Sequence, residues 1–183
     1  MGRMQNWKQL QMGSVVAFAW SIAVVCGCRP DGEPDVGDSA TDGCLAEGNP
    51  SLTIGQGSGS EFNALADGDE VGLDVAPQGG FGVSVRAKSA GLVADDVVDV
   101  LLVTEIAGEQ VGSFLNEGTM LYCQDDGAGL LWGVVVGFDP DVYTTNEDLL
   151  ELDGQEVSLG VTAYDVAGNE AEGWVDVVIR VGQ

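Results

Sequence analysis

The sequence predicts an all-β domain, and three features of residues 49–183 support this fold class. From about Pro50 onward, apolar residues alternate with polar residues or glycine at a period of two. Gly, Pro, Asn and Asp interrupt the alternation at short intervals, as turns between strands do. No stretch has sustained helical periodicity; the best candidate is a single turn at 146–152, which Asn146 could cap. About seven to nine short strands in one domain predict an antiparallel β-sandwich of immunoglobulin-like type, with a closed barrel as the alternative.

The alternating segments follow one another along the domain. The segment around Val98–Val103 is apolar on both faces, which indicates a central or covered strand. The segment 164–169 has the Asp, Gly and Asn of a tight turn and resembles the last hairpin of many bacterial immunoglobulin-like repeats. The predicted strands are 71–75, 81–88, 98–103, 132–138, 157–163 and 175–181, with shorter candidates at 52–54, 111–115 and 120–123.

Trp132 opens one of these segments and shares its parity with Val134, Val136 and Phe138. An aromatic residue followed by β-branched residues at a period of two is typical of a central strand that faces the second sheet. We therefore expect Trp132 in the core, where its replacement by alanine would cost about 3–5 kcal/mol. The alternative places Trp132 at the surface, where it stacks on a sugar.

The first 27 residues have the organisation of a lipoprotein signal peptide. Arg3 and Lys8 give a positive start, and the apolar run 12–25 has the length of a signal sequence; a retained membrane helix is the alternative. The run ends in Val-Cys-Gly-Cys, which resembles the lipobox of bacterial lipoproteins and indicates lipidation of Cys28. Arg29 follows where the sorting pattern for inner-membrane retention has Asp, so the expected location is the outer membrane, on its periplasmic or its surface face.

Residues 28–48 are expected to form the lipidated cysteine and a disordered acidic tether, because Pro, Gly and Asp predominate and little apolar surface is available to bury. Residues 49–183 are expected to form the sandwich. Two cysteines, Cys44 and Cys123, remain outside the signal region. In an oxidising envelope these two are expected to form a disulfide, which would stabilise the domain by roughly 4 kcal/mol; two free thiols are the alternative.

Charge and the missing histidine exclude several functions. The chain has 30 acidic and 6 basic residues, a formal charge of −24, and loss of Arg3 and Lys8 with the signal peptide makes it −26. No basic cluster exists to bind a phosphate backbone, so a nucleic-acid partner is not expected. Without histidine, the Ser-His-Asp and Cys-His catalytic arrangements and the usual zinc sites are absent. The chain is therefore not expected to be an enzyme or to carry a cofactor.

Calcium is the one ion for which the sequence offers ligands. Carboxylate and amide oxygens at the ends of a sandwich can hold Ca²⁺. The alternative is that these residue types form the turns themselves. The candidate ligands are Asp67, Asp69, Asp165 and Asn169.

One region, about a fifth of the chain, carries a more specific resemblance. It contains a Phe…Leu-x-Asp-Gly-Asp element at 62–69, a Pro-Gln-Gly-Gly-Phe element at 77–81, and then Arg86 and Gly91-Leu92. This pattern resembles uncharacterised exported bacterial lipoproteins of myxobacterial type with an immunoglobulin-like domain. The sequence departs from the pattern at Gly82, where the family often has histidine. The resemblance implies an exported sandwich and no particular activity.

Together these features predict a cell-envelope protein held to the membrane by its lipid. The expected function is that of a structural or adhesive module, or of a module that binds a protein or a glycan. The alternative is an envelope lipoprotein that binds calcium or another small ligand.

Overall fold

A computed structural model describes residues 48–75 and 80–182 of this protein. The chain divides into two units, residues 1–38 and 39–183, and the described residues belong to the second. The predicted signal peptide, Cys28, most of the tether and Cys44 lie outside the described residues. None of the helices in the described part has the length and the apolar character needed to cross a membrane.

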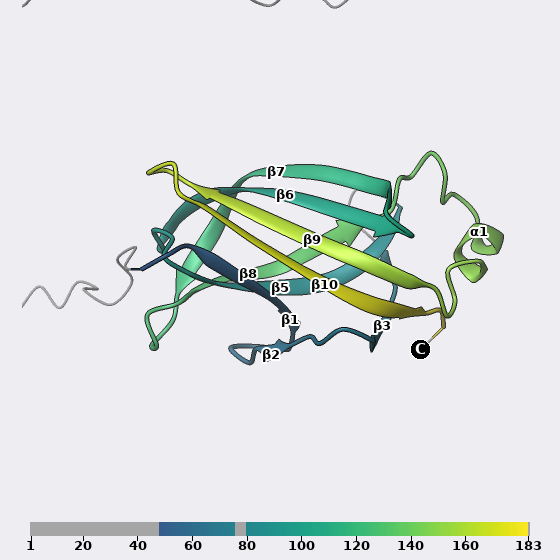
Figure 1. The fold of residues 1–183 in the computed structure, drawn as a ribbon, viewed down its shortest axis with the longest axis horizontal. Coiled ribbons are helices and arrows are strands. Elements are labelled where there is room, and N and C mark those ends of the chain that lie inside the picture. Colours follow the sequence, from purple (N-terminus) through teal and green to yellow (C-terminus); the bar gives the residue numbers. More distant parts are fainter. Residues whose placement is uncertain (1–47, 76–79, 183) are drawn as a thin grey trace, which may run out of the picture. The chain divides into compact units, whose positions relative to one another are not determined.

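The prediction of an all-β sandwich is confirmed, and Figure 1 shows strands throughout with one short helix. Eight strands in the described residues have four residues or more, and β2 and β4 have two each. The elements are β1 Ser51–Gln56, β2 Asn63–Ala64, β3 Asp69–Gly72, β4 Asp74–Val75, β5 Phe81–Ala90, β6 Asp96–Ile106, β7 Glu109–Cys123, β8 Gly129–Gly137, α1 Asn146–Leu150, β9 Glu156–Asp165 and β10 Glu170–Arg180.

The strands lie in the order β2-β1-β5-β8-β7-β6-β9-β10-β3, with β4 beside β5. Strand β7 connects the two layers: it pairs with β6 from Glu109 to Leu121 and with β8 only at Tyr122 and Cys123. We call the layer with β1, β2, β4, β5 and β8 sheet A, and the layer with β3, β6, β9 and β10 sheet B. The sheet curls so that β1 meets β10, where a Cβ on Gly173 would come within 2.5 Å of the Leu52 carbonyl oxygen. All pairings are antiparallel except that of β10 with β3.

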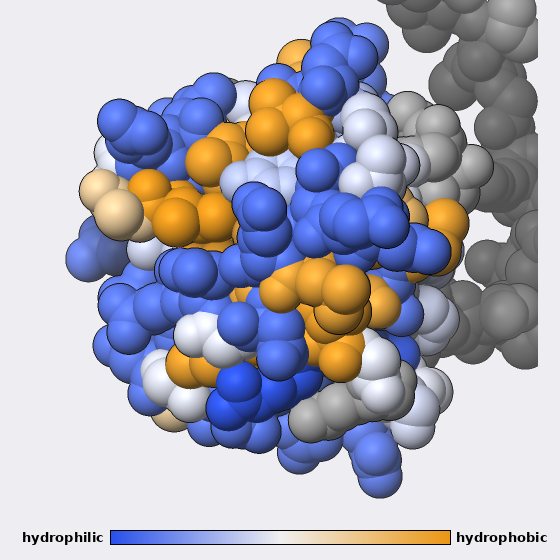
Figure 2. All heavy atoms as spheres, turned by 90° about the vertical axis from the view of Figure 1, so that its right-hand side faces the viewer, coloured by the Kyte–Doolittle hydropathy of each residue, from blue (hydrophilic) through white to orange (hydrophobic). Residues whose placement is uncertain are grey.

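The core lies between the two sheets and follows the period-two pattern. Val83, Val85 and Ala87 of β5 point inward, and Val157, Leu159 and Val161 of β9 face them from sheet B. Alternation works because successive side chains of a strand point to opposite faces. The strands therefore keep most of their carboxylates in water while they bury most of their valines and leucines. Figure 2 shows the end of the domain that carries α1, where hydrophilic residues separate the apolar ones into several groups.

The N-cap of the single helix lies one residue before the predicted one, and the helix begins at Asn146. Thr145, not Asn146, is the N-cap, and its hydroxyl accepts a hydrogen bond from the Asp148 backbone N–H while the Asp148 carboxylate accepts one from the Thr145 N–H. This reciprocal pair is a capping box. The hydrogen bonds from Thr145 and Thr144 lower the pKa of Asp148, although its slight burial acts in the opposite direction.

Candidate functional site

Trp132 lies on the surface, so the prediction that it belongs to the core is wrong. Its side chain is 45% exposed, whereas Leu131 and Val134 are buried. The pairing of β5 with β8 shifts here, because Val85 faces Val134 and Ala87 faces Leu131. Trp132 and Gly133 therefore oppose the single residue Arg86, and Gly133 has a φ of 66°, as the glycine of a β-bulge does. The extra residue reverses the alternation and turns Trp132 outward.

On the outer face of sheet A, Trp132 is the middle of three stacked planar groups. The Tyr122 ring is stacked on it, with centroids 4.8 Å apart and an interplanar angle of 24°. The Arg86 guanidinium carbon lies 5.8 Å from the Trp132 ring centroid. Because β8 lies between β5 and β7, these two neighbours occupy opposite sides of the indole. The two faces of the Trp132 ring are thus in use, and its edge is what solvent meets.

The stack covers a buried leucine that lies outside the main core. Leu130 is 1% exposed but does not belong to the cluster between the sheets. Its Cα partners across the sheet are Lys88 and Tyr122, whose side chains lie on the outer face. The outer face of sheet A therefore has a small apolar centre of its own, with an aromatic and a cationic cover. We call the group Phe62, Arg86, Lys88, Tyr122 and Trp132 the aromatic–cation face.

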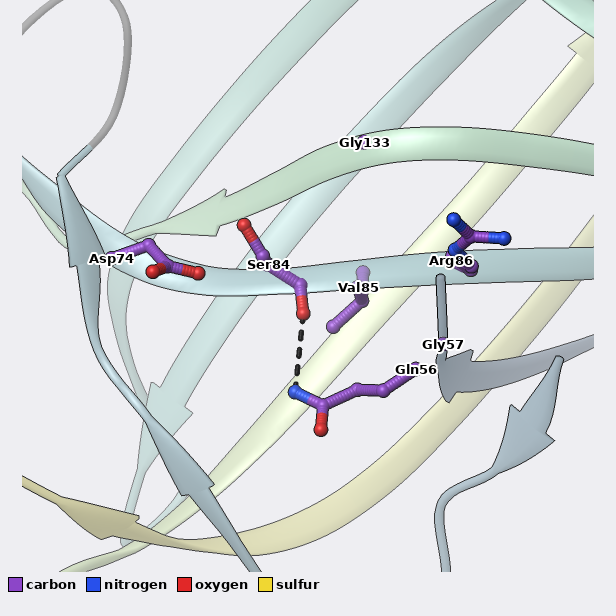
Figure 3. A pocket seen from close by; sticks show the side chains of 7 residues that line it. All are labelled: Gln56, Gly57, Asp74, Ser84, Val85, Arg86 and Gly133. Carbon is purple, nitrogen blue, oxygen red and sulfur yellow. Dashed lines mark hydrogen bonds between the residues drawn. The ribbon is translucent and has the colours of Figure 1, made fainter. Parts of the chain in front are cut away.

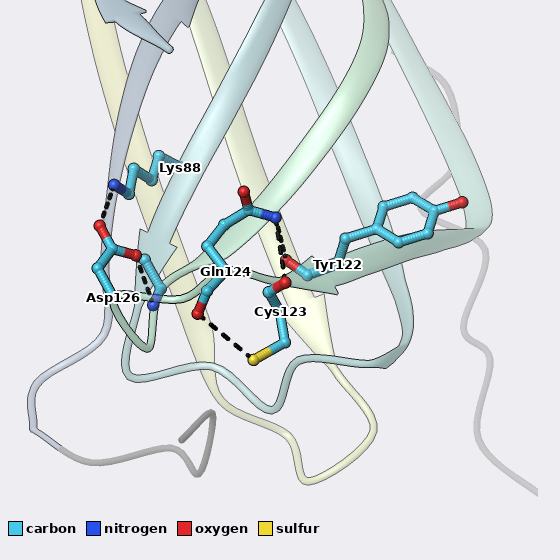
Figure 4. A network of polar contacts seen from close by, with 6 residues as sticks. Lys88, Tyr122, Cys123, Gln124 and Asp126 are labelled. Carbon is cyan, nitrogen blue, oxygen red and sulfur yellow. Dashed lines mark hydrogen bonds and ion pairs between the residues drawn. The ribbon is translucent and has the colours of Figure 1, made fainter. Parts of the chain in front are cut away.

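Two of the three basic residues in the described part of the chain belong to this face; Arg180 is the third. Arg86 donates to the carbonyl oxygens of Gly59 at 2.6 Å and Glu61 at 2.9 Å, which holds the loop between β1 and β2. Lys88 forms an ion pair with Asp126 in the β7–β8 turn (Figure 4). The Lys88 ammonium also lies 6.0 Å from the Phe62 ring centroid. The hydrogen bond from Lys88, with further help from the Ala128 N–H, lowers the pKa of the Asp126 carboxyl.

A groove of about 330 Å³ adjoins Arg86. It lies where the edge of β5 passes from β4, which pairs with Phe81 and Gly82, to β1, which pairs from Arg86 onward. The Gln56 side-chain amide crosses this gap and donates to the Ser84 carbonyl oxygen at 3.2 Å (Figure 3). Gly133 leaves the opposite side open because it has no side chain. The lining residues are Gln56, Gly57, Asp74, Ser84, Val85, Arg86 and Gly133.

Cys123 is part of a disulfide, as predicted. Its predicted partner, Cys44, lies outside the described residues, so the pairing of these two stays a prediction. The Cys123 sulfur lies 3.6 Å from the Gln124 carbonyl oxygen (Figure 4). Because a disulfide sulfur carries no proton, this is a van der Waals contact and not a hydrogen bond. Cys123 follows Tyr122 directly, so the disulfide begins next to the aromatic–cation face.

The four predicted calcium ligands lie in two separate turns. Asp69 pairs with Val177 of β10, roughly 25 Å along the strand from the turn between β9 and β10 that contains Asp165 and Asn169. The Asp69 carboxylate accepts from the Ala66 N–H at 2.9 Å, and that of Asp67 accepts from the Asp176 N–H at 3.1 Å. Within the described ranges, no group of three or more acidic, cysteine or histidine side chains could hold a metal ion.

Asp165 organises the β9–β10 turn. Its carboxylate accepts hydrogen bonds from the backbone N–H groups of Val93 at 3.0 Å, Ala167 at 2.9 Å and Asn169 at 2.8 Å, and from the Asn169 side chain at 2.8 Å. Burial by itself would raise the pKa of Asp165, but these hydrogen bonds outweigh it and the pKa is lowered. The same residue types that suggested calcium therefore build the turn and tie it to the segment before β6.

No protein-family model matches the sequence, and no curated protein matches it. Among solved structures, the CooA pilin subunit from enterotoxigenic Escherichia coli is similar over 73% of this chain and 99% of that chain. The sequence identity is 13% and the TM-score is 0.33. A likeness this weak carries no information about function. The resemblance to myxobacterial lipoproteins stays a prediction.

Asp165→Asn is expected to destabilise the domain by about 1–3 kcal/mol at neutral pH, because in either orientation the amide NH₂ would face two of the four hydrogen-bond donors of this turn. A carboxyl with a lowered native pKa stabilises above its unfolded pKa of about 3.9, and this contribution is lost as the pH falls through the native pKa. The difference in the free energy of unfolding between wild type and variant, measured by urea denaturation, should therefore become smaller below about pH 4. The exposed neighbour Glu170→Gln is the control, and an equal loss in that variant would contradict the assignment.

Trp132→Ala is expected to lower the free energy of unfolding by about 1–2 kcal/mol, because the stacking is lost and Leu130 is uncovered. This loss is smaller than the loss expected when a substitution creates a cavity in the core. Phe138→Ala is the matched aromatic control, because Phe138 follows the same strand and is 1% exposed; its cost should be about 3–5 kcal/mol. Chemical denaturation of both variants gives the order. An equal loss of stability in the two variants would contradict the surface position of Trp132.

Proposed function

We propose that this chain is a lipid-anchored cell-envelope protein whose β-sandwich binds a neutral saccharide in the groove beside Trp132. The observation that carries the proposal is the composition of this groove. Asp74, Gln56, Ser84 and Arg86 line it and provide a carboxylate, an amide, a hydroxyl and a guanidinium, and Gly133 of the lining directly follows the exposed Trp132. No other function class derives as much support from described side chains.

The polar groups of the groove suit a ligand with many hydroxyls. A sugar hydroxyl both donates and accepts hydrogen bonds, so it can donate to the Asp74 carboxylate, accept from Arg86, and do either with the Ser84 hydroxyl. Asp74 and Arg86 balance each other in charge, which favours a neutral ligand. An anionic glycan would also have to enter the field of a chain with a formal charge of −24.

The stacked groups adjoin the groove, because Arg86 and Gly133, which line it, are neighbours of Trp132. Since Tyr122 and Arg86 occupy the faces of the Trp132 ring, a sugar would pack against the exposed indole edge and not on its face. The stack holds Trp132 and Arg86 in place before a ligand arrives. Preorganisation of this kind reduces the entropy lost on binding. The bulge at Gly133 contributes by keeping both the indole and the groove on the outer surface.

The calcium alternative has less support from the described residues. The carboxylates that it requires already accept hydrogen bonds from backbone N–H groups, and they lie at separate places. The ligands in question are Asp67, Asp69, Asp165 and Asn169.

The saccharide proposal predicts retarded migration of the exported protein in native gels that contain a neutral polysaccharide. The panel would be dextran, laminarin, xylan and soluble chitin oligomers, with alginate as the anionic comparison. Combining Asp74→Ala with Ser84→Ala removes two hydrogen-bonding groups and should weaken binding about tenfold or more. Ser84→Ala leaves the backbone carbonyl that Gln56 uses intact.

Glu109→Ala is the control, because Glu109 is an exposed acid at the β6–β7 hairpin, away from the groove. This variant should bind as the wild type does, and all variants should melt within a degree or two of it. Retardation by alginate alone, or by none of the polysaccharides, would overturn the proposal.

The anchoring part of the proposal predicts that Cys28→Ser abolishes palmitate labelling and releases the protein from membranes. The reason is that acyl chains, and no spanning helix, would hold the exported chain to the bilayer. Cys26→Ser is the matched control, because the neighbouring cysteine fits the lipobox poorly. Persistent labelling of the Cys28→Ser protein would show that the anchor has been assigned to the wrong residue.

A further inference from the structure

The outer face of sheet B carries an apolar group that spans four neighbouring strands. Leu101 of β6 faces Leu115 of β7, and Val103 faces Gly160 of β9, which in turn faces Trp174 of β10. Directly opposed residues of a sheet point to the same side. We call Leu101, Val103, Leu115, Tyr164 and Trp174 the outer patch.

The outer patch is exposed and held in a fixed arrangement. Leu115 is 56% exposed, Trp174 46% and Tyr164 38%. The Trp174 indole lies on Gly160, where a Cβ would come within 2.6 Å of the ring, and its N–H donates to the Glu172 carboxylate at 2.7 Å. An anchored tryptophan within an apolar surface is typical of the residues that dominate protein interfaces.

Carboxylates surround the outer patch, and no cation of the described residues lies within it. Asp99 faces Tyr164, Glu172 faces Thr162, and Glu117 follows Leu115 on β7. Arg86 and Lys88 belong to sheet A. Arg180 is ion-paired with Glu70 and lies roughly 20 Å along β10 from Trp174. A partner surface that fits an apolar centre with an acidic rim would have apolar residues at its centre and basic residues around them.

Charge also excludes two other occupants of this surface. A second copy would bring the same acidic rim against the first, since a twofold contact uses the same surface on both chains. The segment 29–43 of this chain is itself acidic, with four Asp and one Glu against Arg29. Like charges placed opposite each other oppose the contact in both cases.

We propose that the outer patch docks a cationic segment of a partner protein. Apolar side chains of the partner would pack on Leu115 and Trp174, and its Lys or Arg side chains would lie against Asp99, Glu117 and Glu172. This interaction is independent of the proposed saccharide site, because it uses the opposite sheet and none of the same residues. It would let one domain hold a glycan and a protein together.

The test measures binding of the full exported protein to a fluorescent peptide of alternating lysine and leucine, with poly-lysine of equal charge as the comparison. Leu115→Ser should weaken binding of the alternating peptide about tenfold, because the main exposed apolar contact is lost. Leu150→Ser is the matched control: Leu150 on α1 is 64% exposed and lies outside the outer patch. It should leave the affinity within about twofold. Raising NaCl from about 50 to about 300 mM should weaken binding to both peptides.

Equal effects of Leu115→Ser and Leu150→Ser would overturn the proposal, as would poly-lysine that binds as tightly as the alternating peptide. Sedimentation velocity supplies a second measurement. A wild-type dimer that Leu115→Ser dissociates would identify a second copy as the occupant and would also overturn it. The Asp74→Ala and Ser84→Ala variant should bind the peptide normally, so failure of the saccharide proposal and failure of this one are distinguishable.

Discussion

Strand β8 crosses sheet A with one residue more than its neighbour β5, because Trp132 and Gly133 together oppose Arg86. The segments on both sides of this bulge bury their alternate side chains, Leu131 before it and Val134, Val136 and Phe138 after it. Because of the bulge, odd-numbered side chains point into the core before it and even-numbered side chains after it. Its consequence on the outside is an indole in solvent beside an arginine, with an open backbone at Gly133. The aromatic–cation face and the groove depend on this one local feature.

Charge acts on the outer surfaces in a second way. Acidic residues cannot enter the core without large desolvation costs, so the described part of the sandwich places nearly all of its acidic residues on outward positions and in turns. Several of these carboxylates also stabilise turns. Asp165, Asp67 and Asp69 each accept hydrogen bonds from backbone N–H groups. Two of the three basic residues in the described part of the chain, Arg86 and Lys88, lie on β5. Arg86 and Lys88 tie loops to sheet A through carbonyl oxygens and Asp126, which leaves the outer face of sheet B acidic.

Most of the fold could be predicted from the sequence, because a period of two is a direct signature of a half-buried strand. The predicted segments at 81–88, 157–163 and 175–181 are strands with the expected faces buried. The prediction that Trp132 lies in the core was wrong for a physical reason. The sequence does not show whether a glycine within a strand has an extended or a positive φ. The Gly133 that follows Trp132 was the available signal for a bulge. The approach of Arg86 and Tyr122 to Trp132 had no local signal, since it depends on strand order.

The two outer faces differ in what they can offer a ligand. On sheet A the aromatic rings are already stacked on a neighbour and on a guanidinium, so hydrogen-bonding groups in the adjacent groove must provide the selectivity. On sheet B the Trp174 ring lies flat on Gly160 and presents its other face, so apolar contact can provide affinity while the carboxylates choose the sign of the partner's charge. The core between the sheets is mainly apolar, and the buried Thr104 hydroxyl of β6 donates a hydrogen bond to the Gly137 carbonyl oxygen of β8 at 2.7 Å. Because the two proposed sites share no residues and lie on opposite sheets, the two binding free energies should add.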